Sequence, residues 1–449
     1  MPIGCALGVI LALLAGAGGA SAQPKYLLAE TVKEGDCFHV QIDLTLQGEL
    51  RISRDGKPTS LKLTAAVSHE FSERVLHVGP TGLADRSARI YETAKAEITV
   101  ADSCSRRTLR PERRLVAAQR HKDQPLAYSP AGPLTYEEAE LIGGHFDSLA
   151  LTGLLPGREV AVGERWKVPP AVVQALCHFE GLTEHDLTGK LDKVEGKTAH
   201  VSITGSATGI DLGALVKLKV EAVCRFDLES GRLVRLEWKQ HDEREQGPAN
   251  PAATLRAATV LRRTPIEPPS SLSLVALVSV PVDFNPPEPM IQIAYRDPQG
   301  RFELMHGREW HLVGQTADHV ILRMLDRGDF VAQLTVTPWT PAEKGKHLSP
   351  EAFKEAMADT PGWEPDRELQ AGEVPAADGR WIYRISAVGS LDGVEVLQNF
   401  YLVAGPGGEQ VVLAFTMSPK QAERLGSRDL AIVGSVDFPS SRKDAPTKP

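Results

Sequence analysis

The stretch FHVQIDLTLQGELRI, Phe38 to Ile52, decides the fold, because apolar and polar side chains alternate along it almost without interruption. Every second residue from Phe38 is apolar or glycine, and the residues between them are polar or charged. A period of two is typical of a β-strand with one face buried and the other in water. RDGK at 54–57 supplies a turn, and the alternation resumes from Leu61 to Phe71. The sequence therefore predicts a long antiparallel hairpin.

A second hairpin of the same kind is predicted further along the chain. Residues 216–228 alternate in the same way, ESG at 229–231 supplies a turn, and alternation returns from Val234 to Trp238. At about 3.3 Å per residue, strands of this kind are roughly 45–50 Å long, and strands of that length coil strongly. We therefore expect a curved antiparallel sheet, half-barrel or sandwich in this part of the chain.

One helix and one edge strand are predicted between the two hairpins. Thr135 and Glu138 have the spacing of a capping box, and apolar residues share one face as far as Leu149. Further on, VGERWKV at 162–168 runs into two prolines, which a central strand does not tolerate. This unit is therefore interpreted as a turn into a short edge strand, with the ring of Trp166 covering one end of the core.

The amino terminus has the pattern of an export signal. It reads MPIGCALGVILALLAGAGGASAQ, an uncharged apolar run, and Ala20-Ser21-Ala22 matches the small-x-small rule for signal peptidase. The sequence predicts a signal peptide over residues 1–22 and export to the periplasm or the extracellular space. A retained membrane anchor is the alternative. No later segment reaches the roughly 18 apolar residues of a membrane span, so no transmembrane span is expected after signal cleavage.

Four cysteines remain after removal of the signal: Cys37, Cys104, Cys177 and Cys224. An even number in an oxidising compartment predicts two disulfides. Sequence order favours Cys37 with Cys104 and Cys177 with Cys224. Buried free thiols are the alternative.

Two proline-rich tracts, TPIEPPSS and NPPEP, lie close together after the second hairpin and predict a linker. The chain of 449 residues is too long for one ordinary domain. We therefore divide it into a signal peptide, a β-rich antiparallel domain with one helix, the linker, a second domain and a disordered tail: residues 1–22, 23–263, 264–289, 290–439 and 440–449.

The order of predicted elements in the second domain is distinctive. It begins with a strand at aromatic Phe302 and a Gly-x-x-Trp step ending at Trp310, and continues with two strands and a helix opening Ser-Pro-Glu at Ser349. Three long strands, a short helix from Ser418 and a final strand over IVGSVDF at 432–438 complete it.

This order resembles the PsbP-like α/β sandwich, the fold of extrinsic photosystem proteins, periplasmic DcrB-like lipoproteins and a nuclear-import cofactor. The resemblance covers about one third of the chain, Met290 to Pro439, and implies a binding or assembly protein without a catalytic centre. The first domain is similar to uncharacterised secreted β-rich domains of planctomycete-type bacteria. The expected fold class is α+β: a long-stranded curved antiparallel β domain followed by a smaller PsbP-like antiparallel α/β sandwich.

Known catalytic and metal-binding patterns are missing from the sequence. It holds no Gly-x-Ser-x-Gly elbow, His-Glu-x-x-His helix or glycine-rich phosphate or dinucleotide loop. His306, His311 and His319 come nearest to a metal cluster, but His306 and His311 are five residues apart on a strand-like step and therefore face opposite sides. We expect no catalytic residue, no cofactor and no metal, and thus a protein that is not an enzyme.

The segment SRRTLRPERRLVAAQRHK, Ser105 to Lys122, is strongly basic. Such a strip can contact anionic lipid, an anionic polysaccharide or an acidic protein surface, and a solvated strand face is the alternative. Nucleic acid is not expected, because aromatic residues are not interleaved with the charges. The candidate contact residues are Arg106, Arg107, Arg110, Arg113, Arg114, Arg120 and Lys122.

These observations predict a non-catalytic exported envelope protein that acts as a binding or assembly module. Its expected partner is an envelope protein or an anionic polymer. The alternative is a carrier of a lipid or another hydrophobic ligand, held in a half-barrel cavity of the first domain that the helix over 135–149 closes.

Overall fold

The computed structural model describes residues 23–439, apart from 55–56, 122–123, 144–146 and 377. The predicted signal peptide and the predicted disordered tail therefore lie outside the described residues.

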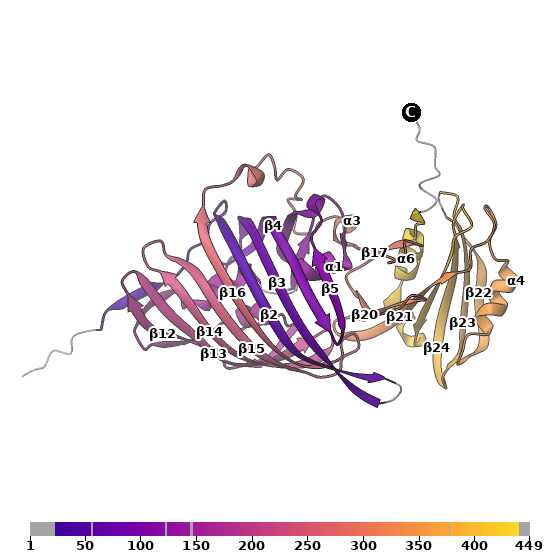
Figure 1. The fold of residues 1–449 in the computed structure, drawn as a ribbon, viewed down its shortest axis with the longest axis horizontal. Helices are drawn as coiled ribbons and strands as arrows, with labels where there is room; N and C mark the ends of the chain where they lie inside the picture. Colours follow the sequence, from indigo (N-terminus) through magenta and orange to yellow (C-terminus); the bar gives the residue numbers. More distant parts are fainter. Residues whose placement is uncertain (1–22, 55–56, 122–123, 144–146, 377, 440–449) are drawn as a thin grey trace, which may run out of the picture.

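A single curved antiparallel sheet of 13 strands makes up most of the first domain (Figure 1). Its main path runs β10-β12-β13-β14-β15-β16-β2-β3-β4-β6-β7, with β11 on β13 and β5 on β4. The strands are β2 (Cys37–Arg54), β3 (Lys57–Val78), β4 (Ala84–Val100), β5 (Ser103–Thr108), β6 (Leu115–His121), β7 (Gln124–Tyr128), β10 (Arg165–Lys167), β11 (Gly181–His185), β12 (Thr188–Glu195), β13 (Thr198–Asp211), β14 (Ala214–Asp227), β15 (Arg232–Arg244) and β16 (Ala252–Ile266).

Both predicted hairpins are confirmed. β2 pairs with β3 with Gly48 opposite Leu63, and β14 pairs with β15 with Ala222 opposite Trp238. β16 then pairs with β2 along its whole length. The last strand of the domain therefore lies beside the first long one, at the centre of the sheet.

Short helices cover the inner, apolar face of the sheet. They are α1 (Tyr136–Gly143), the 3-10 segment η2 (Ser148–Leu154) and α2 (Pro170–Leu176), and their apolar residues join one core with the sheet. The predicted capping box is present, because the N–H of Thr135 donates to Glu138 and the N–H of Glu138 donates to the Thr135 hydroxyl. A two-stranded sheet of β1 (Lys25–Leu28) and β9 (Arg158–Ala161) flanks this layer.

The predicted edge strand at Trp166 is also confirmed. β10 is the end strand of the large sheet and pairs with β12. The Trp166 ring is buried and donates its Nε1–H to the carbonyl of Leu154 at 3.0 Å. The ring therefore holds η2 against the end of the sheet.

The second domain has a sheet of seven strands in the order β19-β20-β21-β25-β24-β23-β22. α4 (Pro350–Ala358) packs on one face, and α6 (Arg428–Ser435) packs on the other. The strands are β19 (Trp310–Gln315), β20 (Val320–Asp326), β21 (Asp329–Trp339), β22 (Trp363–Val374), β23 (Trp381–Leu391), β24 (Val394–Ala404) and β25 (Gln410–Met417), and α5 (Ala422–Leu425) precedes α6.

A small sheet joins the two domains. β8 (Leu134–Thr135) of the first domain pairs in parallel with β17 (Ile293–Arg296), which also pairs with β18 (Glu303–His306). α3 (Glu288–Ile291) precedes β17, and Arg308 donates to the carbonyls of Ile291 and Ala127. The domains are thus connected by hydrogen bonds as well as by the chain.

The predicted α+β class is wrong, because 56% of the chain is strand and 14% is helix. The protein is mostly β, and its helices are short: α4, at nine residues, is the longest α-helix in the described part of the chain. The predicted final strand IVGSVDF is largely helix α6. Its buried residues Asp429, Ile432 and Val433 have the i, i+3, i+4 spacing of a helix face.

The segment predicted as a linker packs on the sheet. β16 runs on to Ile266, and residues 270–284, here called the strap, follow it over the top of the sheet in Figure 1. Leu272, Leu277 and Val280 are buried against Ala88, Ala117 and Tyr128, on the face opposite to α2. Four other aliphatic side chains of the strap are exposed by 76–89%: Leu274, Val275, Val278 and Val282.

Candidate functional site

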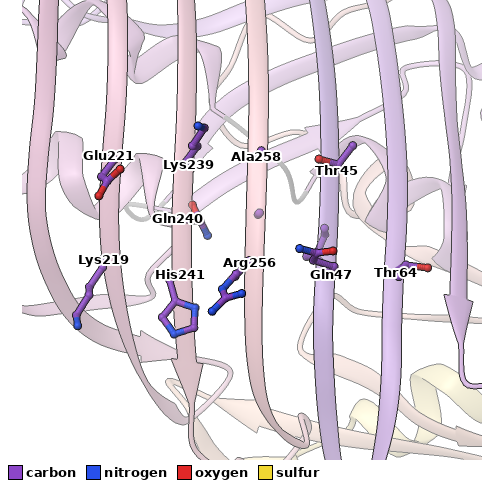
Figure 2. A pocket seen from close by; sticks show the side chains of 12 residues that line it. Thr45, Gln47, Thr64, Lys219, Glu221, Lys239, Gln240, His241, Arg256 and Ala258 are labelled. Atoms are coloured by element: carbon purple, nitrogen blue, oxygen red, sulfur yellow. The ribbon is translucent and has the colours of Figure 1, made fainter.

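A polar pocket of about 600 Å³ lies on the outer face of the large sheet (Figure 2). The alternation that buries apolar residues on the inner face sends the intervening polar residues to this face. Antiparallel register then aligns side chains from five neighbouring strands in one row: Lys219 of β14, His241 of β15, Arg256 of β16, Gln47 of β2 and Thr64 of β3. We call this pocket the outer groove.

The outer groove is basic. Lys219, Lys239 and Arg256 line it together with one acid, Glu221, so its net charge is +2 with His241 neutral. None of the three basic side chains forms an ion pair with a residue that the structure describes. Their charges are therefore available to an external anion.

A second pocket of about 760 Å³ continues the outer groove across β3, β4 and β5. Thr45 and Thr64 line both pockets. Two of its three basic residues are neutralised, because Arg106 bonds to Glu97 at 3.0 Å and Arg107 bonds to Glu140 of α1, whereas Lys95 forms no ion pair with a described residue. The positive charge is thus concentrated at β14, β15 and β16.

The predicted basic strip does not form a single charged surface. Arg110 binds both carboxylate oxygens of Glu138, at 2.6 and 2.7 Å, and Arg120 pairs with Asp147 at 3.1 Å. Arg113 donates to the carbonyl of Pro133, Arg114 is exposed, and Lys122 lies outside the described residues. Three of the six arginines, Arg107, Arg110 and Arg120, therefore anchor α1 and the η2 region to the sheet.

The predicted disulfides are not formed, and all four cysteines are free thiols. Cys177 lines the same cavity as Leu218 of β14, whereas Cys224 is six residues further along β14, roughly 20 Å from Leu218 at strand spacing. Cys104 pairs in register with Thr99, and Thr99 lies in the same cross-strand row as Gln47 of β2. Cys37 is ten residues along β2 from Gln47, so Cys37 and Cys104 lie far apart on the sheet. Sequence order could not reveal these separations.

A cavity of about 220 Å³, here called the inner cavity, lies on the inner face beneath the residues that follow α2. Its lining is aliphatic on the side of β2, β3 and β4, and charged on the side of β13 and β15. Burial raises the pKa of Asp242 to about 6 and also raises the pKa of Asp211. The inner cavity is smaller than the roughly 300–1,000 Å³ of most ligand pockets, and so too small for a lipid.

An apolar cleft of about 550 Å³ opens at the end of the sheet where β3 turns into β4. Part of its wall is aliphatic and is formed by Val32, Leu83, Leu155 and Val172. Thr152 adds a hydroxyl that is buried and has no hydrogen-bond partner among the described residues. We call this pocket the end cleft.

The three histidines considered as metal ligands occupy the second domain. His306 is buried on β18, and burial lowers the pKa of both His306 and His311 to about 4. His319 lies in an exposed turn and contacts Thr316. Within the described residues, no group of three or more His, Cys, Asp or Glu side chains is placed to hold a metal.

Sequence reasoning missed the residues of the outer groove. Lys219 and Glu221 occupy outward positions of a strand that was predicted correctly, and outward charges on a strand normally mean only a solvated face. The row forms only through the pairing of β16 with β2, which joins segments about 200 residues apart. That pairing leaves no local signal in the sequence.

No family model and no curated protein matches the chain, so the resemblance of the first domain to planctomycete-type proteins has no support. Among solved structures, the solution structure of cyanobacterial PsbP (CyanoP) from Synechocystis sp. PCC 6803 is similar with 13% identity and a TM-score of 0.26, over 33% of this chain and 92% of that one. Lipovitellin, in a structure titled for lipid-protein interactions, is similar with 8% identity and a TM-score of 0.27, over 52% of this chain and 25% of that one. At this level of similarity neither comparison assigns a function.

The helices of the described residues do not include one that is both long and apolar enough to cross a membrane.

Proposed function

We propose that this chain is a non-catalytic exported binding module that holds an extended anionic polymer in its outer groove. The observation that carries the proposal is the cross-strand row of polar side chains, in which Lys219 and Arg256 lack ion pairs. Lys239, two residues along β15 from His241, also lines the outer groove without an ion pair to a described residue. A polymer with regularly spaced carboxylate or sulfate groups matches a row whose members follow at the strand spacing of about 4.8 Å.

The shape of the outer groove also supports a polymer. The outer groove and the second pocket beside it share Thr45 and Thr64, and together they run across the strands from β14 to β5. A long open groove suits an extended chain that enters and leaves at both ends, whereas a small molecule is usually held in an enclosed pocket. The amide of Gln47 and the hydroxyls of Thr45 and Thr64 add uncharged hydrogen-bonding groups for a carbohydrate.

The proposal is tested by measuring the fluorescence anisotropy of labelled polymers mixed with the protein. Polygalacturonate and heparin carry different anionic groups, and dextran is a neutral control. We expect both anionic polymers to bind, and their affinity to fall as salt rises from about 0.05 to 0.5 M, because exposed charges are screened. Binding equal to that of dextran, or affinity independent of salt, would contradict the proposal.

A second candidate function is the carriage of an apolar ligand, which the end cleft favours. Its volume of about 550 Å³ lies within the usual range for ligand pockets, and its walls are largely aliphatic. Native mass spectrometry of protein purified from its own envelope would test this function. A stoichiometric lipid that is lost in Val172→Trp, a variant that fills the cleft, would support it. Ligand-free protein would reject it.

A further inference from the structure

The inner cavity has two chemically different walls. One wall is aliphatic and comes from strands β2, β3 and β4: Leu44, Leu46, Val67 and Ile98. The other wall carries polar residues from the end of β13 and from β15, namely Asp211, Gln240, Asp242 and Arg244, beside the apolar Val216 and Leu218 of β14. Residues Leu176 to Phe179, which end α2 and follow it, form the roof. A ligand in this cavity would therefore meet a charged wall and an apolar wall at once.

The carboxylate of Asp242 is held in a fixed position with one oxygen unused. Its Oδ2 accepts a hydrogen bond from Gln240 at 2.9 Å, and Gln240 in turn accepts one from the indole N–H of Trp238 at 2.8 Å. Its Oδ1 is buried and has no hydrogen-bond partner among the described residues. A buried carboxylate oxygen without a partner is costly. Because Asp242 lines the inner cavity, its carboxylate is the acceptor nearest to hand for a donor that enters the cavity.

The polar wall has an excess of one negative charge. Arg244 is the basic residue of this wall, and its Nη1 lies 3.8 Å from Asp211 Oδ2 while its Nε donates to the carbonyl of Pro251. Burial lowers the pKa of His178 in the roof, which therefore stays neutral at pH 7. Arg244 balances Asp211, and Asp242 has no corresponding cation. A single positive charge brought in by a ligand would neutralise the wall.

We propose that the inner cavity binds a small organic cation, a primary ammonium joined to an aromatic or branched aliphatic body. The ammonium would donate to Asp242 Oδ1, and the body would lie against Leu44, Val67 and Ile98. The volume agrees with this class, because a cavity of about 150 Å³ holds benzene and this one measures about 220 Å³. The site is separate from the outer groove and does not depend on the function proposed there.

Isothermal titration of the full chain tests this proposal without altering the protein. 2-Phenylethylamine and cyclohexylmethylamine are the cationic probes, and 3-phenylpropionate is an anion of similar shape. We expect both amines to bind with 1:1 stoichiometry at pH 7.5, and the anion to bind at least about tenfold more weakly because it meets an unpaired carboxylate. If neither amine binds more tightly than the anion, the proposal is overturned.

Two variants on β15 locate the binding. Asp242→Asn keeps the side-chain shape and removes the charge, and we expect it to weaken amine binding at least about tenfold, the effect of losing a hydrogen bond to a charged group. Glu243→Gln is the matched control, because Glu243 is adjacent but exposed on the outer face, and its amine affinity should be unchanged. Equal amine affinity in the wild type and in Asp242→Asn would overturn the proposal even if the amines bind.

Discussion

At the scale of single residues, Asp242 makes the clearest pH-dependent contribution to stability. Burial raises its pKa in the folded protein to about 6, and Asp211 nearby adds to this, while Gln240, His241 and Arg244 act in the opposite direction. In the unfolded chain an Asp has a pKa of about 4. Between these values the folded protein holds a proton that the unfolded chain has lost, so this residue makes the protein less stable as pH rises through that window.

Asp242→Asn is therefore expected to stabilise the protein above pH 6. The free energy of unfolding should rise by about 1–3 kcal/mol at pH 7.5 and change little at pH 4, where the acid is already protonated. Urea unfolding at the two pH values measures both differences. A variant that is destabilised at pH 7.5 would show that the ionised carboxylate is satisfied in the folded protein.

The buried ion pair of Glu73 with Arg89 in the first domain should stabilise the folded protein when it is ionised, whereas ionised Asp242 destabilises it. Glu73 accepts hydrogen bonds from Arg89 at 2.8 Å and from the hydroxyls of Ser87 and Ser148. Burial alone would raise the pKa of Glu73, but the charges of Arg89 and Arg263 and the hydrogen bonds from Arg89 and Ser87 lower it below its usual value. Because Ser148 begins η2, this network fastens the covering layer to the sheet.

Glu73→Gln leaves the Arg89 guanidinium buried without its anion and should cost about 3–5 kcal/mol. Chemical denaturation measures this loss. Glu97→Gln, which removes the partner of exposed Arg106, is the matched control and should leave the midpoint unchanged. Similar midpoints for both variants would mean that the Glu73 network does not stabilise the fold.

At the scale of elements, the strap is a proline-flanked segment whose apolar residues pack on the sheet, and its contribution to stability can be measured. Leu277 is 7% exposed and packs on the sheet, whereas its neighbour Val278 is 86% exposed. Leu277→Ala should destabilise the first domain by about 2–4 kcal/mol, and Val278→Ser should change stability by less than about 0.5 kcal/mol. Thermal unfolding compares the two. If both variants are neutral, the segment is the linker that its prolines predict.

The sequence predicted those elements whose signals are local. The alternation at Phe38 to Ile52, the capping box at Thr135 and the Ser349 cap of α4 all correspond to observed features, because each depends on residues a few positions apart. The sequence has no alternation of apolar and polar residues over β22, because this strand lies at the edge of the sheet and is almost entirely exposed.

The prediction failed where distant segments decide the outcome. The strap resembles a linker in composition, and only the surface of β4, β6 and β7 makes its apolar residues a packing element. Order along the chain predicts two cysteine pairs, but the two cysteines of each pair lie at different positions along the strands of the folded sheet. The groove residues belong to strands whose neighbours are set by the pairing of β16 with β2. Short-range patterns contain none of this information.

At the scale of the whole molecule, the two domains are held together at several points. β8 pairs with β17, Arg308 bonds to Ala127, and Arg323 bonds to the carbonyl of Pro248. Gly213 and Gly328, both at positive φ, meet so closely that a Cβ on Gly213 would lie 2.2 Å from the Gly328 carbonyl. The second domain thus lies against the ends of β13 and β15.

We expect Lys219, Lys239 and Arg256 to hold the anionic polymer in the outer groove. The dissociation constant of polygalacturonate is measured for two triple variants. In the groove variant, Lys219, Lys239 and Arg256 are changed to Gln. The control variant combines Arg158→Gln, Lys193→Gln and Lys197→Gln, and loses the same net charge. The control residues are exposed and lie outside the outer groove. We predict at least about hundredfold weaker binding for the groove variant, from the loss of several charged hydrogen bonds, and a change of less than about threefold for the control. Equal weakening in the two variants would rule out the outer groove as the binding site, because binding would then depend on the net charge of the protein.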